Sequence, residues 1–199
     1  MGAVRQLSSS EILSVLTSRL ARTNSLNSAA KAHCSSDEIE LEKMLFTQYF
    51  FDFSTAIEST LRGIVFEAMR GESFSRYWTY LARQDEQSKP FFLKIEDIKA
   101  ITGLEFLTYD RAELLNDFNA RFKCLADPIK SRSGFPPIPD DEEEFKSQYS
   151  AIKKDRNSVA HSLTIENVSF NADRLFDFCS IFFLLFRFYE KLEAMHQPT

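Results

Sequence analysis

Glycine and proline are scarce in this chain of 199 residues, which contains 5 Gly and 6 Pro. A β-sandwich or barrel needs many tight turns, where these two residues are favoured, so the composition argues against both architectures. The same few glycines cannot build the Gly-rich phosphate cradle of the common nucleotide sites. The 20 Phe residues fall mainly in segments with helical periodicity. This pattern predicts an all-α protein, an up-and-down helical bundle packed with aromatic rings.

Cysteine is also rare, because the chain has only Cys34, Cys124 and Cys179. These three residues lie far apart and show neither metal-ligand nor redox spacing, which favours a reducing, cytoplasmic location. The chain contains no His-Glu-x-x-His and no Gly-x-Ser-x-Gly motif. We therefore expect neither a metal nor a cofactor.

The sequence lacks an apolar run long enough for a membrane span, and its first residues contain no apolar core of a secretory signal. We therefore expect no membrane partner. Residues 1–35 are rich in Ser and carry three Arg but a single acid, Glu11. This composition is compatible with a transit peptide, although an ordinary amphipathic first helix explains it as well.

The net charge of −5 provides no global field that would attract nucleic acid. Basic side chains nevertheless gather in one segment, at Lys146, Lys153, Lys154 and Arg156. A solvated helix face and a local basic site both remain open interpretations of this segment. The acidic run Asp140–Glu144 is interpreted as a helix start rather than a metal site, with Asp140 as the cap.

The chain is predicted to form a single domain over residues 1–199, with a peripheral helix and linker at 1–35 and the bundle core at 36–196. A capping box, Ser8-x-x-Glu11, opens a first helix that is expected to fade in the polar stretch Thr23–Ser36. A second capping box, Ser35-x-x-Glu38, opens a long helix that ends at Gly71. Further helices are expected over Ser73–Arg83, over Leu93–Ile101 closed by Gly103, from Asp110 to about Leu125, from Asp140 through His161, and after Asn171, with a surface loop over Ser131–Asp140.

The last of these helices is apolar on nearly every side between Leu175 and Phe188. A helix without a polar face must be covered all round. A second copy of the chain would cover it more easily than one bundle of this size, so the helix predicts a homodimer.

One hexapeptide, Arg156-Asn157-Ser158-Val159-Ala160-His161, holds a base and a cation at fixed spacing. Asn157 and His161 are four residues apart and share a helix face, so the amide can set the imidazole tautomer. Arg156 is rotated from His161 by about 140° and lies roughly 7.5 Å from it along the axis. One helix therefore cannot easily aim both side chains at one phosphorus atom, whereas two copies related by a twofold axis can.

With these residues, the chain resembles the HEPN superfamily, whose usual signature is Arg, often followed by Asn, then four to six residues and His. The segment Ile57-Glu58-Ser59-Thr60-Leu61-Arg62 is similar to the acid-bearing core helix of stand-alone prokaryotic members. The resemblance covers about residues 36–196, although it does not account for the first helix or for the region from Trp78 to Asp127.

The resemblance implies a twofold homodimer of helical bundles with a composite ribonuclease site. Arg156, Asn157 and His161 would form the catalytic set, with Glu58, Lys153 and Lys154 in support. The implied reaction is attack of the RNA 2′-hydroxyl on its own phosphate, which gives a 2′,3′-cyclic phosphate without a metal. Members of this size often serve as toxins or phage-defence effectors. We therefore expect an RNA substrate, for which the acidic pI suggests a structured RNA such as tRNA, and a restraining antitoxin or regulatory partner.

Two other interpretations remain open at the level of sequence. The chain can be a non-catalytic HEPN dimer that acts as a binding or regulatory module. Alternatively, it is an unrelated helical interaction protein in which His161 complements a helix dipole and Arg156 pairs with a neighbouring acid. An i,i+4 pair with Arg62 is likewise the simpler account of Glu58.

Overall fold

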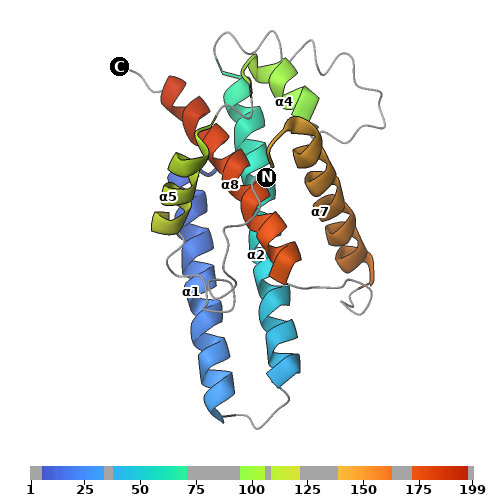
Figure 1. Cartoon of the computed structure of the whole chain (residues 1–199). Coiled ribbons are helices and arrows are strands. Elements are labelled where there is room, and N and C mark those ends of the chain that lie inside the picture. Colours follow the sequence, from blue (N-terminus) through green and yellow to red (C-terminus); the bar gives the residue numbers. More distant parts are fainter. Residues whose placement is uncertain are drawn as a thin grey trace, which may run out of the picture.

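A computed structural model describes residues 6–33, 38–70, 95–105, 109–121, 139–162 and 172–196 (Figure 1). The helices in these ranges are α1 (Ser9–His33), α2 (Glu38–Ala68), α4 (Ile95–Thr102), α5 (Arg111–Arg121), α7 (Glu142–Ser162) and α8 (Ala172–Met195). The described ranges contain no strand. The predicted all-α class is therefore confirmed for this part of the chain.

The four long helices alternate in direction, and α2 and α8 form the centre of the bundle (Figure 1). α1 packs against α2 as one side of an antiparallel hairpin, while α7 packs against α8. Contacts along α2 and α8 join residues that stay about 129 positions apart, from Phe50 with Phe178 to Glu67 with His196, which directly follows α8. This constant separation shows that α2 and α8 run parallel.

Aromatic rings fill the space between α8 and its neighbours. Phe50 meets Phe178 edge to face at 4.7 Å between ring centroids, and Phe118 of α5 meets Phe183 at 5.5 Å. Such edge-to-face pairs add roughly 0.5–1.5 kcal/mol to the gain from burial. Ten residues of α8 are at most 1 % exposed within the single chain: Phe178, Cys179, Ile181, Phe182, Phe183, Leu184, Leu185, Phe186, Phe188 and Tyr189.

A close approach between α2 and α8 occurs at Gly63. A Cβ atom built on Gly63 would overlap the ring of Tyr189, whose tip lies against the α2 backbone. The phenol is fixed in this position, because Tyr189 Oη donates a hydrogen bond of 2.9 Å to the carbonyl of Leu7. The absence of a side chain at Gly63 is therefore what allows the two central helices to pack at this distance.

The predicted capping box at the start of α1 is confirmed. The backbone N–H of Ser8 donates to Glu11 Oε2 at 2.9 Å, and the N–H of Glu11 donates to Ser8 Oγ at 3.3 Å. Ile12, Leu16 and Leu20 then enter the core.

The expectation that this helix fades after Thr23 is wrong, because α1 continues to His33. Two physical features extend it. The stretch Ala29-Ala30-Lys31-Ala32 has high helix propensity, and the hydroxyl of Tyr49 on α2 donates a hydrogen bond to the side-chain oxygen of Asn24.

The end of α4 and the start of α5 lie at predicted residues. Gly103 follows α4 with a φ of 70°, and its N–H donates to the carbonyl of Lys99 at 2.8 Å. This is the left-handed C-terminal cap for which glycine is favoured. Asp110 caps α5, since its Oδ1 accepts a hydrogen bond of 2.9 Å from the N–H of Glu113.

Ion pairs fasten α5 to α8. Arg121 lies 2.6 Å from both Asp117 and Glu190, while Arg187 lies 3.1 Å from Glu190 and 3.2 Å from Glu113. Arg121 also stacks over the ring of Phe186 at 5.6 Å. These charges are partly exposed, so the network orients α5 more than it stabilises the fold.

Several predicted features lie outside the described residues, namely the cap at Ser35, the helix end at Gly71, the helix over Ser73–Arg83 and most of the loop before Asp140. The long helix itself is described from Glu38 to Ala68. Within the described ranges, no helix combines the length and the apolar character needed to span a membrane.

Candidate functional site

The helix that carries the Arg156–His161 motif begins with its acidic run, but at a different cap from the predicted one. The N–H of Glu144 donates to Asp141 Oδ1 at 2.8 Å, and Glu144 Oε2 accepts from the N–H of Asp140 at 2.7 Å. The capping residue is therefore Asp141 and not Asp140, because Asp141 directly precedes the first helical residue, Glu142, and its carboxylate accepts from an N–H of the first turn. Lys146 pairs with Glu143 at 2.9 Å one turn later.

One stripe of α7 packs against the bundle. Phe145 and Ile152 are buried, and the half-buried ring of Tyr149 stacks on Phe145 at 5.9 Å between centroids. Ser150 and Lys154 are exposed on the opposite side. These residues define an inner and an outer stripe of the helix, and both stripes can be followed into the motif.

All six residues of the Arg156–His161 motif lie in the last two turns of α7, which ends at Ser162. The helical placement of the motif is therefore confirmed. The side chains of Arg156, Asn157 and His161 lie outside the described part of the chain. Their positions along the helix are nevertheless fixed by its backbone.

The helical register separates the two charged positions of the motif. Arg156 follows Tyr149 by seven residues and Ile152 by four, which places its Cα within about 40° of both and on the inner stripe. His161 follows Lys154 by seven residues and Ser150 by eleven, which places its Cα within about 20° of both and on the outer stripe. Asn157 lies on the outer stripe as well. The base and the cation thus occupy different faces of one helix.

The supporting residues lie on two helices that are not principal packing partners. Lys153 and Lys154 are on α7, where Lys154 is exposed and the Lys153 side chain is not described. Glu58 is half-buried on α2, one turn before the exposed Arg62, and α2 packs mainly against α8 and α1. The supporting role of Glu58 at the Arg156–His161 motif therefore stays a prediction.

The sequence argument that a second copy would cover α8 more easily than one bundle loses its support. The residues of this helix from Phe178 to Leu185 are buried within a single chain, against α2, α1, α7 and α5. The predicted homodimer consequently depends on the separation of Arg156 and His161 around α7.

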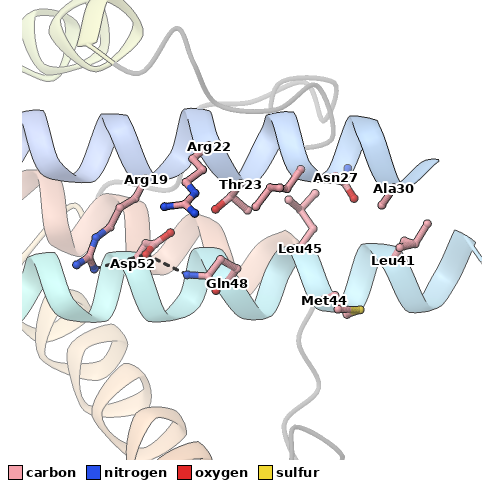
Figure 2. A pocket seen from close by; sticks show the side chains of 11 residues that line it. Arg19, Arg22, Thr23, Asn27, Ala30, Leu41, Met44, Leu45, Gln48 and Asp52 are labelled. Carbon is pink, nitrogen blue, oxygen red and sulfur yellow. Dashed lines mark hydrogen bonds and ion pairs between the residues drawn. The ribbon is translucent and has the colours of Figure 1, made fainter. Parts of the chain in front are cut away.

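A groove between α1 and α2 was not expected from the sequence (Figure 2). It has a volume of about 540 Å³, within the range of small-molecule sites. Figure 2 shows Arg19, Arg22 and Asp52 gathered at one end, whereas Ala30 and Leu41 lie at the other. The remaining lining residues are Thr23, Leu26, Asn27, Met44, Leu45 and Gln48.

Asp52 is a buried acid in this groove. Its side chain is 2 % exposed, its Oδ1 accepts a hydrogen bond of 3.2 Å from Gln48 Nε2, and Arg19 lies 3.7 Å away. Oδ2 has no hydrogen-bond partner among the described residues. Burial raises the pKa of Asp52, while Gln48 and Arg19 oppose this shift.

A signal for the groove was present in the sequence. Asp52 interrupts the apolar run Phe50-Phe51-Asp52-Phe53 and lies in register with Leu45 and Tyr49 on the buried side of the long helix. An acid on the apolar face of a core helix needs a partner or a function.

Within the described ranges, no three His, Cys, Asp or Glu side chains gather closely enough to hold a metal ion. The described part of the chain is an all-α bundle in which the sequence Arg-Asn-x-x-x-His lies in the last two turns of α7. Comparisons with protein-family models, with curated proteins and with solved structures find no match to this chain.

Proposed function

We propose that the protein is a HEPN-like, metal-independent endoribonuclease that acts as a twofold homodimer in the cytoplasm. The observation that carries this proposal is the position of Arg156, Asn157 and His161 in the last two turns of α7, which packs on the buried apolar helix α8. This is the arrangement that the resemblance implies. The biological role that it suggests is a toxin or phage-defence effector restrained by an antitoxin or regulatory partner.

The register of α7 supports a composite site. Because Arg156 and His161 lie on different stripes, a phosphate that reaches His161 of one protomer would take Arg156 from the partner subunit. His161 would move the proton of the RNA 2′-hydroxyl and protonate the leaving 5′-oxygen, with Asn157 fixing its tautomer. Arg156 would stabilise the charge that develops on the phosphorane. The exposed Lys154 would attract the RNA backbone.

The test is cleavage of total RNA, including tRNA, in the presence of EDTA, with analysis of the product ends. We expect 2′,3′-cyclic phosphate and 5′-hydroxyl ends from the wild type, and a loss of at least about a hundredfold in His161→Ala. His33→Ala is the matched control, because His33 is also a histidine at the end of a helix. Cleavage by His161→Ala at the wild-type rate would contradict the proposal.

A mixing experiment tests whether the site is composite. We expect His161→Ala and Arg156→Ala each to be inactive, whereas their heterodimer would rebuild one complete site from two chains. An equimolar mixture should recover about a quarter of the wild-type activity by the statistics of twofold pairing. A mixture that stays inactive, although both variants are folded and exchange subunits, would place both residues in one protomer.

A second candidate function is a non-catalytic HEPN dimer that serves as a binding module. It is favoured by the position of Arg156 on the same stripe as the buried Phe145 and Ile152, where an arginine can have a purely structural role. In this case RNA stays intact, and Arg156→Ala lowers stability rather than activity.

A further inference from the structure

The groove between α1 and α2 is independent of the motif on α7. Its lining comes entirely from α1 and α2, and none of the residues proposed for catalysis belongs to it. Leu26 and Met44 line it and are 61 % and 65 % exposed. The groove is thus open to solvent and apolar along much of its length.

The charges at the polar end of the groove favour an anion. Arg19 and Arg22, both from α1, are two cations that line the groove, whereas Asp52 from α2 is its single acid. Arg19 is occupied by Asp52, but Arg22 makes no hydrogen bond or ion pair with any described residue. Figure 2 shows its guanidinium in the space between the two helices. An anionic group in the groove would provide the missing partner for Arg22.

Asp52 adds a requirement for a group that can share a proton. Its Oδ2 is buried and unpartnered, and burial raises the pKa of this carboxyl. Two carboxyl groups in one site can share a single proton, because both cannot ionise side by side. A ligand carboxylate would therefore meet Asp52 through a shared proton and Arg22 through an ion pair.

The apolar end defines the rest of the ligand. From Arg22 to Ala30 the groove follows α1 for eight residues, or about 12 Å. Its apolar lining residues are Leu26, Ala30, Leu41, Met44 and Leu45, and Thr23 and Asn27 are the polar residues of α1 in this stretch. Its length and apolar character suit an unbranched alkyl chain of medium length.

We propose that this groove is a binding site for a medium-chain alkanoate, with the carboxylate at Arg22 and Asp52 and the alkyl chain along Leu26, Leu41 and Met44. The ligand has one negative head and one apolar tail, which matches the order of polar and apolar residues along the groove. The carboxyl group distinguishes it from cationic amphiphiles of the same length.

Isothermal titration of the full chain with decanoate, below its critical micelle concentration, tests this proposal. We expect one molecule to bind per chain, and decyltrimethylammonium, which has the same tail and the opposite charge, to bind at least tenfold more weakly. Equal binding of the two compounds would show general surfactant adsorption and overturn the proposal, as would the absence of decanoate binding at millimolar concentration.

Variants locate the bound molecule. Met44→Glu introduces a charge beside the tail and should weaken decanoate binding at least tenfold, whereas Met195→Glu should leave it unchanged. The two methionines are similarly exposed, at 65 % and 59 %, but only Met44 lines the groove, so neither substitution disturbs the core. Equal effects of the two substitutions would overturn the assignment.

The polar end has its own test. Arg22→Gln should weaken decanoate binding about tenfold, because it removes the ion pair at an exposed position.

Wild-type binding of decanoate should weaken as the pH rises, since the complex takes up one proton, whereas Asp52→Asn should bind decanoate with little pH dependence. The charged groups that line the groove with Asp52 are Arg19 and Arg22. An identical pH profile for wild type and Asp52→Asn would contradict proton sharing.

Discussion

Gly63 and Tyr189 illustrate how a single residue sets the distance between the two central helices. In Gly63→Ala, the new methyl group would overlap the Tyr189 ring. This ring cannot move aside, because its hydroxyl donates a hydrogen bond to the carbonyl of Leu7. We expect a loss of roughly 1–3 kcal/mol in the free energy of unfolding, despite the higher helix propensity of alanine.

Urea denaturation measures this loss. Arg62→Ala at the neighbouring exposed position is the control, and it should change the free energy by at most about 0.5 kcal/mol. If the two substitutions have equal effects, the helices do not pack through Gly63.

Asp52 makes stability depend on pH. Its folded-state pKa is raised above the ordinary value of 3.8 by burial, so folding favours the protonated form. The resulting stabilisation is complete below the unfolded-state pKa and is lost as the pH rises through the raised folded-state pKa. The permanently neutral Asp52→Asn should therefore gain stability relative to the wild type between pH 4 and pH 7, by about 1.4 kcal/mol per unit of pKa elevation.

Urea denaturation of both proteins at the two pH values isolates this contribution, because all other titrating groups are shared. A free-energy difference that stays constant between pH 4 and pH 7 would mean that folding does not raise the pKa of Asp52.

At the scale of helices, the start of α7 gives a matched pair of substitutions. Asp141→Ala removes the carboxylate that accepts from Glu144 N–H and should cost about 1 kcal/mol. Asp140→Ala should cost less than about 0.5 kcal/mol, because ion pairs of an exposed carboxylate contribute little. Thermal denaturation followed by circular dichroism compares the two, and a larger effect at Asp140 would restore the cap predicted from the sequence.

The helices themselves were largely predictable, because local signals specify them. The Ser8–Glu11 box, the Asp110 cap and the Gly103 terminus depend on residues within one turn of the chain. The end of α1 was not predictable in this way, because its last turns depend on α2 lying alongside. The cap of α7 was missed by one residue, since any acid in the run could have served.

The motif on α7 and the groove between α1 and α2 differ in how far they can be predicted from the sequence. The placement of Arg156 and His161 at a helix end followed from local pattern, and so did their separation around the axis. The groove at Arg22 and Asp52 could not be found from spacing, because it combines residues of α1 and α2 whose register is set only by packing. The apolar character of α8 was evident from the sequence. The helices that bury it could not be predicted from the sequence.

For the molecule as a whole, the burial of α8 within one chain bears on the proposed dimer. A protomer that buries its most apolar helix within its own chain does not need a partner to cover that helix during folding. Dilution should therefore separate the dimer into folded monomers, with sedimentation values falling while the helical circular dichroism signal is unchanged. A helical signal that disappears together with the dimer would identify an obligate dimer and a core shared between chains.

The parallel pairing of α2 with α8 also governs how the chain can reach its native state. Contacts such as Glu67 with His196 join residues 129 positions apart, so the central core forms only after a long loop has closed. During synthesis, the phenylalanines of α2 leave the ribosome well before those of α8, and their partner surface does not yet exist. The nascent chain therefore exposes an aromatic face for seconds, which makes it a natural client for chaperones.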